Sequence, residues 1–118
     1  MRHHHRKRTF GRVKHVRVGL MRSLARSLVL EEGIVTTVAK AKELRPFVER
    51  LVTQAKKNTV ASQRTISSRL GGAPEAVKKL HETLAPRYAD RAGGYTRIIQ
   101  MGQIGKQAAQ SARIEFVK

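Results

Sequence analysis

The chain has 118 residues, 40% of them hydrophobic, which fits one domain with a modest aliphatic core. Its 25 lysines and arginines against eight acidic residues give a formal net charge of +17, and it contains no cysteine. Disulfide scaffolds, thiolate zinc fingers and cysteine nucleophiles are therefore excluded, and apolar runs of at most three residues exclude a transmembrane helix. So large a charge opposes compaction, which indicates a polyanionic partner, nucleic acid before anionic membrane.

The positive charge is concentrated at the N-terminus. Residues 1–30 carry nine lysines and arginines and no acidic residue, which leaves +8 for the rest of the chain. Residues 1–14 hold only Phe10 and Val13 as bulky apolar side chains after the initial methionine, too few to drive folding. We therefore predict that residues 1–14 form an extended basic arm that becomes ordered on a polyanion, and that residues 15–118 form a single α+β domain.

Helical periodicity starts at Val16, and from Leu20 apolar residues recur every three or four positions as far as Val29. Gly33 follows two glutamates and is suited to a left-handed helix cap. The short β-branched run at 34–38 predicts a strand.

Further helices are predicted downstream. Residues 39–57 have an apolar stripe with a period near 3.6, and Pro46 is expected to kink this helix or to mark its effective start. A weaker helix is predicted over residues 59–70. Pro74 is expected to open another helix, and Pro86 to end it.

The last third of the chain changes period. Residues 95–101 predict a strand, and the polar stretch 102–111 is expected to close a long hairpin. In residues 112–116 apolar side chains alternate with Arg113 and Glu115, which is typical of a half-buried strand. The predicted fold is α+β, with about four helices packed on a small three-stranded mixed sheet and an extended basic N-terminal arm.

Catalysis finds no support in the sequence. The acidic residues are scattered, and there is no Gly-x-Ser-x-Gly elbow, phosphate-binding loop or dinucleotide fingerprint. The chain is therefore predicted not to be an enzyme, with no catalytic residues and no cofactor. The consecutive histidines 3–5 cannot all converge on one ion in a helix or strand, so we predict no metal site and interpret them as extra donors and stacking rings in the arm.

Several other interpretations compete with nucleic-acid binding. Residues 102–105 match the Gly-x-x-Gly loop of KH domains, but that loop joins two helices, whereas this segment follows a predicted strand. A transit peptide would also be rich in arginine and poor in acid, although serine occurs only at positions 23 and 27 of residues 1–30. A cationic membrane-active protein is expected to have aromatic anchors, and this chain contains no tryptophan. A DNA-compacting or regulatory protein remains the main alternative, since charge does not separate DNA from RNA.

Three stretches are specific enough to suggest a family. They are the opening Met1-Arg2-His3 with Gly11-Arg12 and His15-x-Arg17, the run Thr36-Thr37-x-x-Lys40-Ala41-Lys42-Glu43-Leu44-Arg45, and the segment from Ala85-Pro86-Arg87-Tyr88 through Gly93-Gly94-Tyr95-Thr96-Arg97-Ile98. With these, the chain resembles the bacterial large-subunit ribosomal protein L-seventeen family over essentially its whole length. The basic block at residues 3–8 and the pair Val13-Lys14 depart from the family pattern, and residues 58–73 match it only loosely.

The resemblance implies a structural constituent of the large ribosomal subunit that binds ribosomal RNA and supports subunit assembly and architecture near the nascent-chain exit. It implies a cytoplasmic location, neighbouring large-subunit ribosomal proteins as further partners, and a single copy per subunit rather than a homo-oligomer. No membrane and no small-molecule substrate are expected. A nucleoid-type or regulatory DNA-binding protein is the alternative.

The expected RNA contacts fall into two groups. Those carried over by the resemblance are Arg2, His3, Gly11, Arg12, His15, Arg17, Lys40, Lys42, Arg45, Arg91, Tyr95 and Arg97. The charge pattern adds His4, Arg6, Lys7, Arg8, Lys14, Arg22 and Arg26. For Tyr95, packing in the core of the sheet is an equal alternative. Because aromatic residues are only 4% of the chain, phosphate contacts are expected to dominate over base reading.

Overall fold

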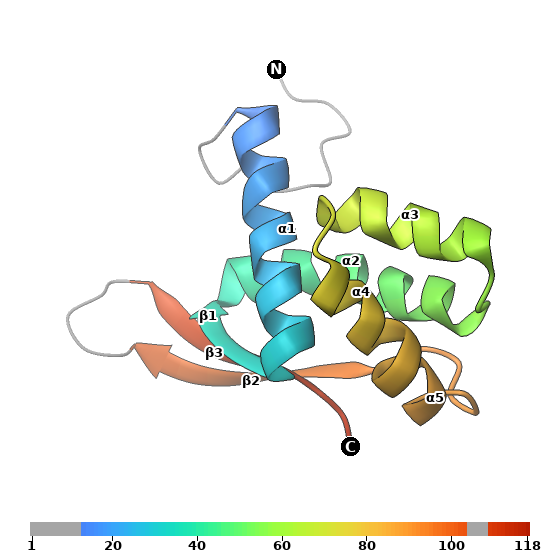
Figure 1. Ribbon diagram of the computed structural model, residues 1–118. Helices are drawn as coiled ribbons and strands as arrows, with labels where there is room; N and C mark the ends of the chain where they lie inside the picture. Colours follow the sequence, from blue (N-terminus) through green and yellow to red (C-terminus); the bar gives the residue numbers. More distant parts are fainter. Residues whose placement is uncertain (1–12, 104–108) are drawn as a thin grey trace, which may run out of the picture.

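The computed structural model describes residues 13–103 and 109–118, in which helices and a small sheet form one packed body (Figure 1). The elements in chain order are α1 (Lys14–Glu31), β1 (Gly33–Thr37), α2 (Val38–Lys56), α3 (Val60–Leu70), α4 (Pro74–Lys79), the π-helical turn η1 (Leu80–Leu84), α5 (Ala85–Arg87), β2 (Thr96–Gln103) and β3 (Gln110–Phe116). The segment from α4 to α5 is continuous, so the predicted set of about four helices on a three-stranded sheet is confirmed. α1 begins at Lys14, the last residue assigned to the arm from the sequence.

The sheet has the strand order β1-β3-β2, with β3 in the centre. Both pairings are antiparallel, and Ile114 of β3 lies opposite Ile34 of β1 and Ile98 of β2. The predicted mixed sheet is therefore wrong in this detail. Alternation of side chains fixes which face of a strand is buried, but not the direction in which it runs beside its neighbour.

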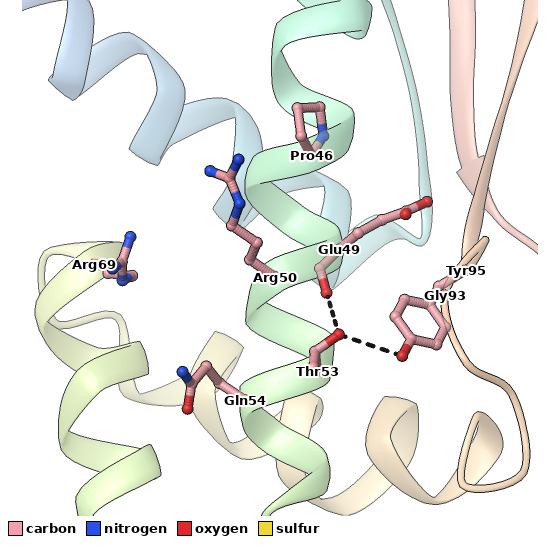
Figure 2. Close-up of a pocket in the computed structure, with 8 residues that line it drawn as sticks. All are labelled: Pro46, Glu49, Arg50, Thr53, Gln54, Arg69, Gly93 and Tyr95. Atoms are coloured by element: carbon pink, nitrogen blue, oxygen red, sulfur yellow. Dashed lines mark hydrogen bonds between the residues drawn. The ribbon is translucent and has the colours of Figure 1, made fainter.

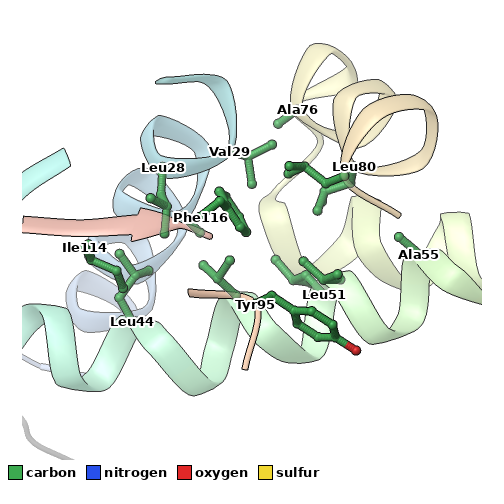
Figure 3. Packing of buried hydrophobic residues seen from close by; sticks show 14 of the residues in the cluster. Leu28, Val29, Leu44, Leu51, Ala55, Ala76, Leu80, Tyr95, Ile114 and Phe116 are labelled. Atoms are coloured by element: carbon green, nitrogen blue, oxygen red, sulfur yellow. The ribbon is translucent and has the colours of Figure 1, made fainter. Parts of the chain in front are cut away.

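The core lies between the sheet and the helices, and α2 is its central element, since it contacts all three strands and also α1 and α3. Leu28 of α1, Leu44 and Leu51 of α2, and Ile114 and Phe116 of β3 are among its buried side chains (Figure 3). The alternation predicted for residues 112–116 is thus confirmed. The core is mainly aliphatic, as the composition predicts.

The turn between α1 and β1 differs from the prediction. The left-handed conformation is adopted by Glu32, with φ of 64°, and Gly33 already belongs to β1. The Glu32 amide donates to the Leu28 carbonyl, and its carboxylate forms ion pairs with Lys79 and Arg87. A Cβ atom on Gly33 would lie 2.3 Å from Nη2 of Arg113 on the neighbouring strand β3, so a larger residue there would displace the end of the Arg113 side chain.

The two prolines within helices neither begin nor end those helices. Pro46 lies inside α2, which begins eight residues earlier with Thr37 as its N-cap, the Thr37 side chain accepting a hydrogen bond from the Lys40 amide. Pro86 does not end its helix, which continues to Arg87. The wide turn η1 ends two residues before Pro86, whose ring would clash with the carbonyl of Glu82 in a regular α-helix.

The loop that connects the two strands of the hairpin is shorter than predicted. β2 extends to Gln103 and β3 begins at Gln110, with a bulge between Gln100 and Gly102. Gly102 adopts φ of 73° at this bulge, which favours glycine.

Candidate nucleic-acid interface

The free end of α1 presents the first group of predicted RNA contacts. Lys14 and His15 are exposed, Arg17 is half-buried, and in Figure 1 this end of the helix extends away from the sheet. None of the three side chains has an ion-pair partner in the described part of the chain. The charges of Lys14 and Arg17 are therefore available to a polyanion at the N-terminal end of α1.

Arg22 and Arg26 lie further along α1 and are both half-buried. Arg22 is a structural residue: its Nε donates to the backbone carbonyl of Arg69 at 3.2 Å and its Nη2 to that of Ser68 at 3.4 Å. These bonds join α1 to the end of α3 while leaving the positive charge of Arg22 unpaired by any described carboxylate.

The first half of α2 carries Lys40, Lys42 and Arg45. Lys42 is exposed and Lys40 is half-buried. Nε of Arg45 lies 3.6 Å from Oε2 of Glu49, one helical turn further on. Glu49 in turn accepts hydrogen bonds from the amide and hydroxyl of Thr96, at 3.2 and 2.8 Å. Arg45 is therefore partly neutralised, and of the predicted α2 residues Lys42 offers the most accessible charge.

Tyr95 is a core residue, which agrees with packing in the core of the sheet, the alternative predicted for it from the sequence. Its side chain is 2% exposed, and its hydroxyl is bonded to Thr53 Oγ1 at 3.3 Å and to Lys56 Nζ at 3.2 Å. Burial raises the pKa of Tyr95, but its hydrogen bonds with Thr53 and Lys56 outweigh this effect and leave the pKa lowered. Lys56 also donates to the backbone carbonyl of Arg91 at 2.5 Å, which fixes the loop while the Arg91 side chain stays exposed.

Arg97 lies on the outer face of the sheet, away from the helices. Its Nη2 is 2.8 Å from Oε2 of Glu115, and Nε of Arg113 is 2.9 Å from Oε1 of the same carboxylate. The hydrogen bonds from Arg97 first, and then from Arg113, lower the pKa of Glu115. Two arginines share one carboxylate, so this face keeps a net positive charge, with the Arg97 side chain 58% exposed.

The structure thus distributes the predicted residues over three places: the free end of α1, the exposed side of α2, and the loop and sheet face that hold Arg91 and Arg97. The remaining predicted contacts lie outside the described residues; they are Arg2, His3, His4, Arg6, Lys7, Arg8, Gly11 and Arg12.

Other kinds of site gain no support. Gly102 and Gln103 of the Gly-x-x-Gly match are strand residues, whereas a KH loop joins helices. Over residues 13–103 and 109–118, no three His, Cys, Asp or Glu side chains are grouped as metal ligands would be. Among the helices of those same segments, none has the length and apolar character to cross a membrane.

Two of the arginines that were not among the predicted contacts line a pocket. Arg50 of α2 and Arg69 of α3 line one open pocket of about 390 Å³, together with Glu49, Gln54 and Tyr95 among others (Figure 2). Arg50 lies on the polar side of its helix, so the helical period could have indicated its exposure. The position of Arg69 depends on how α3 packs against α2, which no local signal gives.

Comparison with known proteins identifies the family. Residues 20–117 match the family described as ribosomal protein L17. Similar proteins, each named large ribosomal subunit protein bL17, include those of Hydrogenobaculum sp. (strain Y04AAS1), 50% identical with all of both chains covered, and of Anaplasma marginale (strain Florida), 50% identical over 99% of this chain and 90% of the relative. That of Thermomicrobium roseum is 47% identical over 99% of each chain. The chain therefore belongs to the ribosomal protein L17 family, whose members are structural ribosomal proteins and not enzymes.

Proposed function

We propose that this chain is a constituent of the large subunit of the cytoplasmic ribosome, that it binds ribosomal RNA, and that it supports subunit assembly and architecture near the nascent-chain exit. The observation that carries the RNA-binding part is the distribution of unpaired cations. Lys14, Arg17, Lys42 and Arg91 have no carboxylate partner in the described segments, although all eight acidic residues of the chain lie there.

Binding is proposed to be mainly electrostatic. Lysine and arginine side chains neutralise phosphates and release condensed counterions, so the affinity depends strongly on salt. Residues 1–14 are proposed to act as the basic arm of this interface, with residues 15–118 as the folded domain that anchors it. Neighbouring ribosomal proteins are proposed as further partners, with one copy of the chain in each subunit.

A competition experiment tests RNA binding against the DNA alternative. The full chain is bound to labelled, protein-free large-subunit ribosomal RNA in magnesium buffer, and unlabelled RNA or duplex DNA of equal nucleotide content is added at several salt concentrations. We expect the RNA to compete more strongly than the DNA, with affinity falling linearly on a double-logarithmic salt plot. Equal competition by DNA at every salt concentration would favour the nucleoid-type alternative.

A further inference from the structure

We propose that Arg50 and Arg69 together bind one phosphodiester group of RNA in the pocket between α2 and α3. This inference rests on the proposed function and deepens it by naming a site on the folded domain. Both arginines line the same pocket, from two different helices (Figure 2). Both are exposed, and neither guanidinium has a hydrogen-bond or ion-pair partner within residues 13–103 and 109–118.

The one acidic residue at this pocket does not neutralise the two arginines. In Figure 2 the carboxylate of Glu49 points towards the Tyr95 side of α2, whereas Arg50 and Gln54 lie on the other side of α2, the side on which Arg69 is found. That carboxylate is engaged by Thr96, through its amide and hydroxyl, and by Arg45. The Glu49–Arg45 pair is formally neutral, so Arg50 and Arg69 leave the pocket with a net charge of about +2.

The electrostatics at the C-terminal end of α3 also favour a bound anion. A helix C-terminus carries a partial negative charge that would repel a phosphate beside Arg69. Here Arg22 donates to the carbonyls of Ser68 and Arg69, in the last turn of α3. Its guanidinium offsets that partial charge, and its side chain packs over Gly71, where an added Cβ would lie 3.4 Å from Arg22 Cδ.

The chemistry of the pocket fits a backbone phosphate better than a base. Tyr95 is buried, with its hydroxyl bonded to Thr53 and Lys56, so it offers no free ring face for stacking. Arg50, Arg69 and Gln54 supply N–H donors, and the planar guanidinium fork matches a pair of phosphate oxygens. A site with these donors holds the RNA backbone in position without reading its sequence.

The test uses the full chain and protein-free large-subunit ribosomal RNA at physiological salt. The variants are Arg50→Gln, Arg69→Gln and the double variant, each checked for an unchanged thermal midpoint by circular dichroism. Arg64→Gln is the matched control, because Arg64 is an exposed arginine on α3 that does not line this pocket. Each pocket variant is expected to bind about tenfold more weakly, whereas the control changes by less than about twofold. Since both arginines serve one phosphate, the loss in the double variant should be smaller than the product of the single losses.

Other results would contradict the proposal that Arg50 and Arg69 bind one phosphate of RNA. If Arg64→Gln lost as much RNA affinity as the pocket variants, and the losses multiplied in the double variant, the effect would come from the net charge of the protein and not from a shared site. Normal RNA affinity of the double variant, with failure to enter large subunits, would assign the pocket to an acidic protein partner. If inorganic phosphate stabilises the wild type but not the double variant while their RNA affinities are equal, the pocket binds a free anion. Wild-type chain that shows no preference for ribosomal RNA would overturn the proposed function as well, so the two failures are distinguishable.

Discussion

The guanidinium of Arg22 donates through Nε to the backbone carbonyl of Arg69 at 3.2 Å, across 47 positions of sequence. This hydrogen bond joins α1, which the N-terminal segment enters, to the end of α3. It is accompanied by a second bond from Nη2 to Ser68. One basic residue therefore holds two helices together at a surface that also carries unpaired positive charge.

Replacing Arg22 by glutamine is expected to lower the free energy of unfolding by about 1 kcal/mol, since hydrogen bonds to charged groups at accessible sites contribute modestly. Arg17→Gln on the same helix is the control, because the Arg17 side chain has no partner in the described segments. Urea denaturation followed by circular dichroism measures both. Equal stability of the two variants would show that the Arg22 contacts do not stabilise the fold.

Tyr95 is expected to act through packing and not through RNA. Tyr95→Phe removes the hydroxyl that Thr53 and Lys56 engage and should cost about 1 kcal/mol of stability. Tyr95→Ala should cost about 3 to 5 kcal/mol, because it empties a large part of the core. Thermal denaturation measures both losses. Ribosomal RNA affinity of the phenylalanine variant should equal that of the wild type; a large loss of affinity with normal stability would restore Tyr95 as an RNA contact.

The periodic parts of the fold were predictable from sequence and the special backbone positions were not. The stripe of α2 and the alternation of residues 112–116 report burial directly, since a helix or strand repeats its exposure every few residues. Glu32, and not Gly33, adopts the left-handed conformation at the end of α1. The contacts around this turn are the ion pairs of Glu32 with Lys79 and Arg87 and the packing of Arg113 over Gly33. Because these contacts join segments that lie far apart in the sequence, no local pattern predicts them.

The same limit applies to the candidate interface. Exposed cations on α1 and α2 follow from the helical period, whereas burial of Tyr95 depends on its contacts with Thr53 and Lys56 of α2. The meeting of Arg50 and Arg69 depends on the packing of α3 against α2. The charge pattern predicts the kind of partner, whereas tertiary contacts decide which cations are exposed and unpaired.

Glu32 should make the protein less stable in acid. The hydrogen bond from Arg87 lowers the pKa of Glu32 below its usual 4.5; burial opposes this effect and Lys79 adds to it. Because the folded-state pKa is depressed, the stabilisation is complete above the unfolded pKa and is lost as the pH falls through the folded one. Glu32→Gln should therefore flatten the decline in unfolding free energy between about pH 5 and about pH 3. Glu82→Gln, at an exposed glutamate without an ion pair in the described segments, should leave the decline as it is.

His81 should make the stability of the protein depend on pH at higher pH values than Glu32 does. Both of its ring nitrogens are buried without a hydrogen-bond partner in the described residues, and burial lowers the pKa of His81 below 6.5. The unfolded chain therefore takes up the proton first, so stability falls as the pH drops below 6.5 and levels off below the folded pKa. Urea denaturation at about pH 7 and about pH 5.5 should show this loss in the wild type and not in His81→Leu. His15→Leu, at an exposed position on α1, should keep the wild-type dependence.

Deleting residues 2–12 tests the proposed arm. Because α1 begins at Lys14, the deletion leaves all described elements in place. We expect unchanged helical circular dichroism, weaker binding to ribosomal RNA and a flatter salt dependence. A Gly/Ser segment of equal length in place of residues 2–12 should behave like the deletion. Loss of the helical signal would instead show that these residues belong to the folded domain.

Association with the large ribosomal subunit is the central claim, and sedimentation measures it most directly. Tagged full-length chain is expressed in bacterial cells, and the lysate is run on a magnesium-containing sucrose gradient after a wash in moderate salt. The chain is predicted to migrate with large subunits and with whole ribosomes, in a fixed ratio to the ribosomal RNA. Recovery of the chain only at the top of the gradient, free of large subunits, would contradict the account.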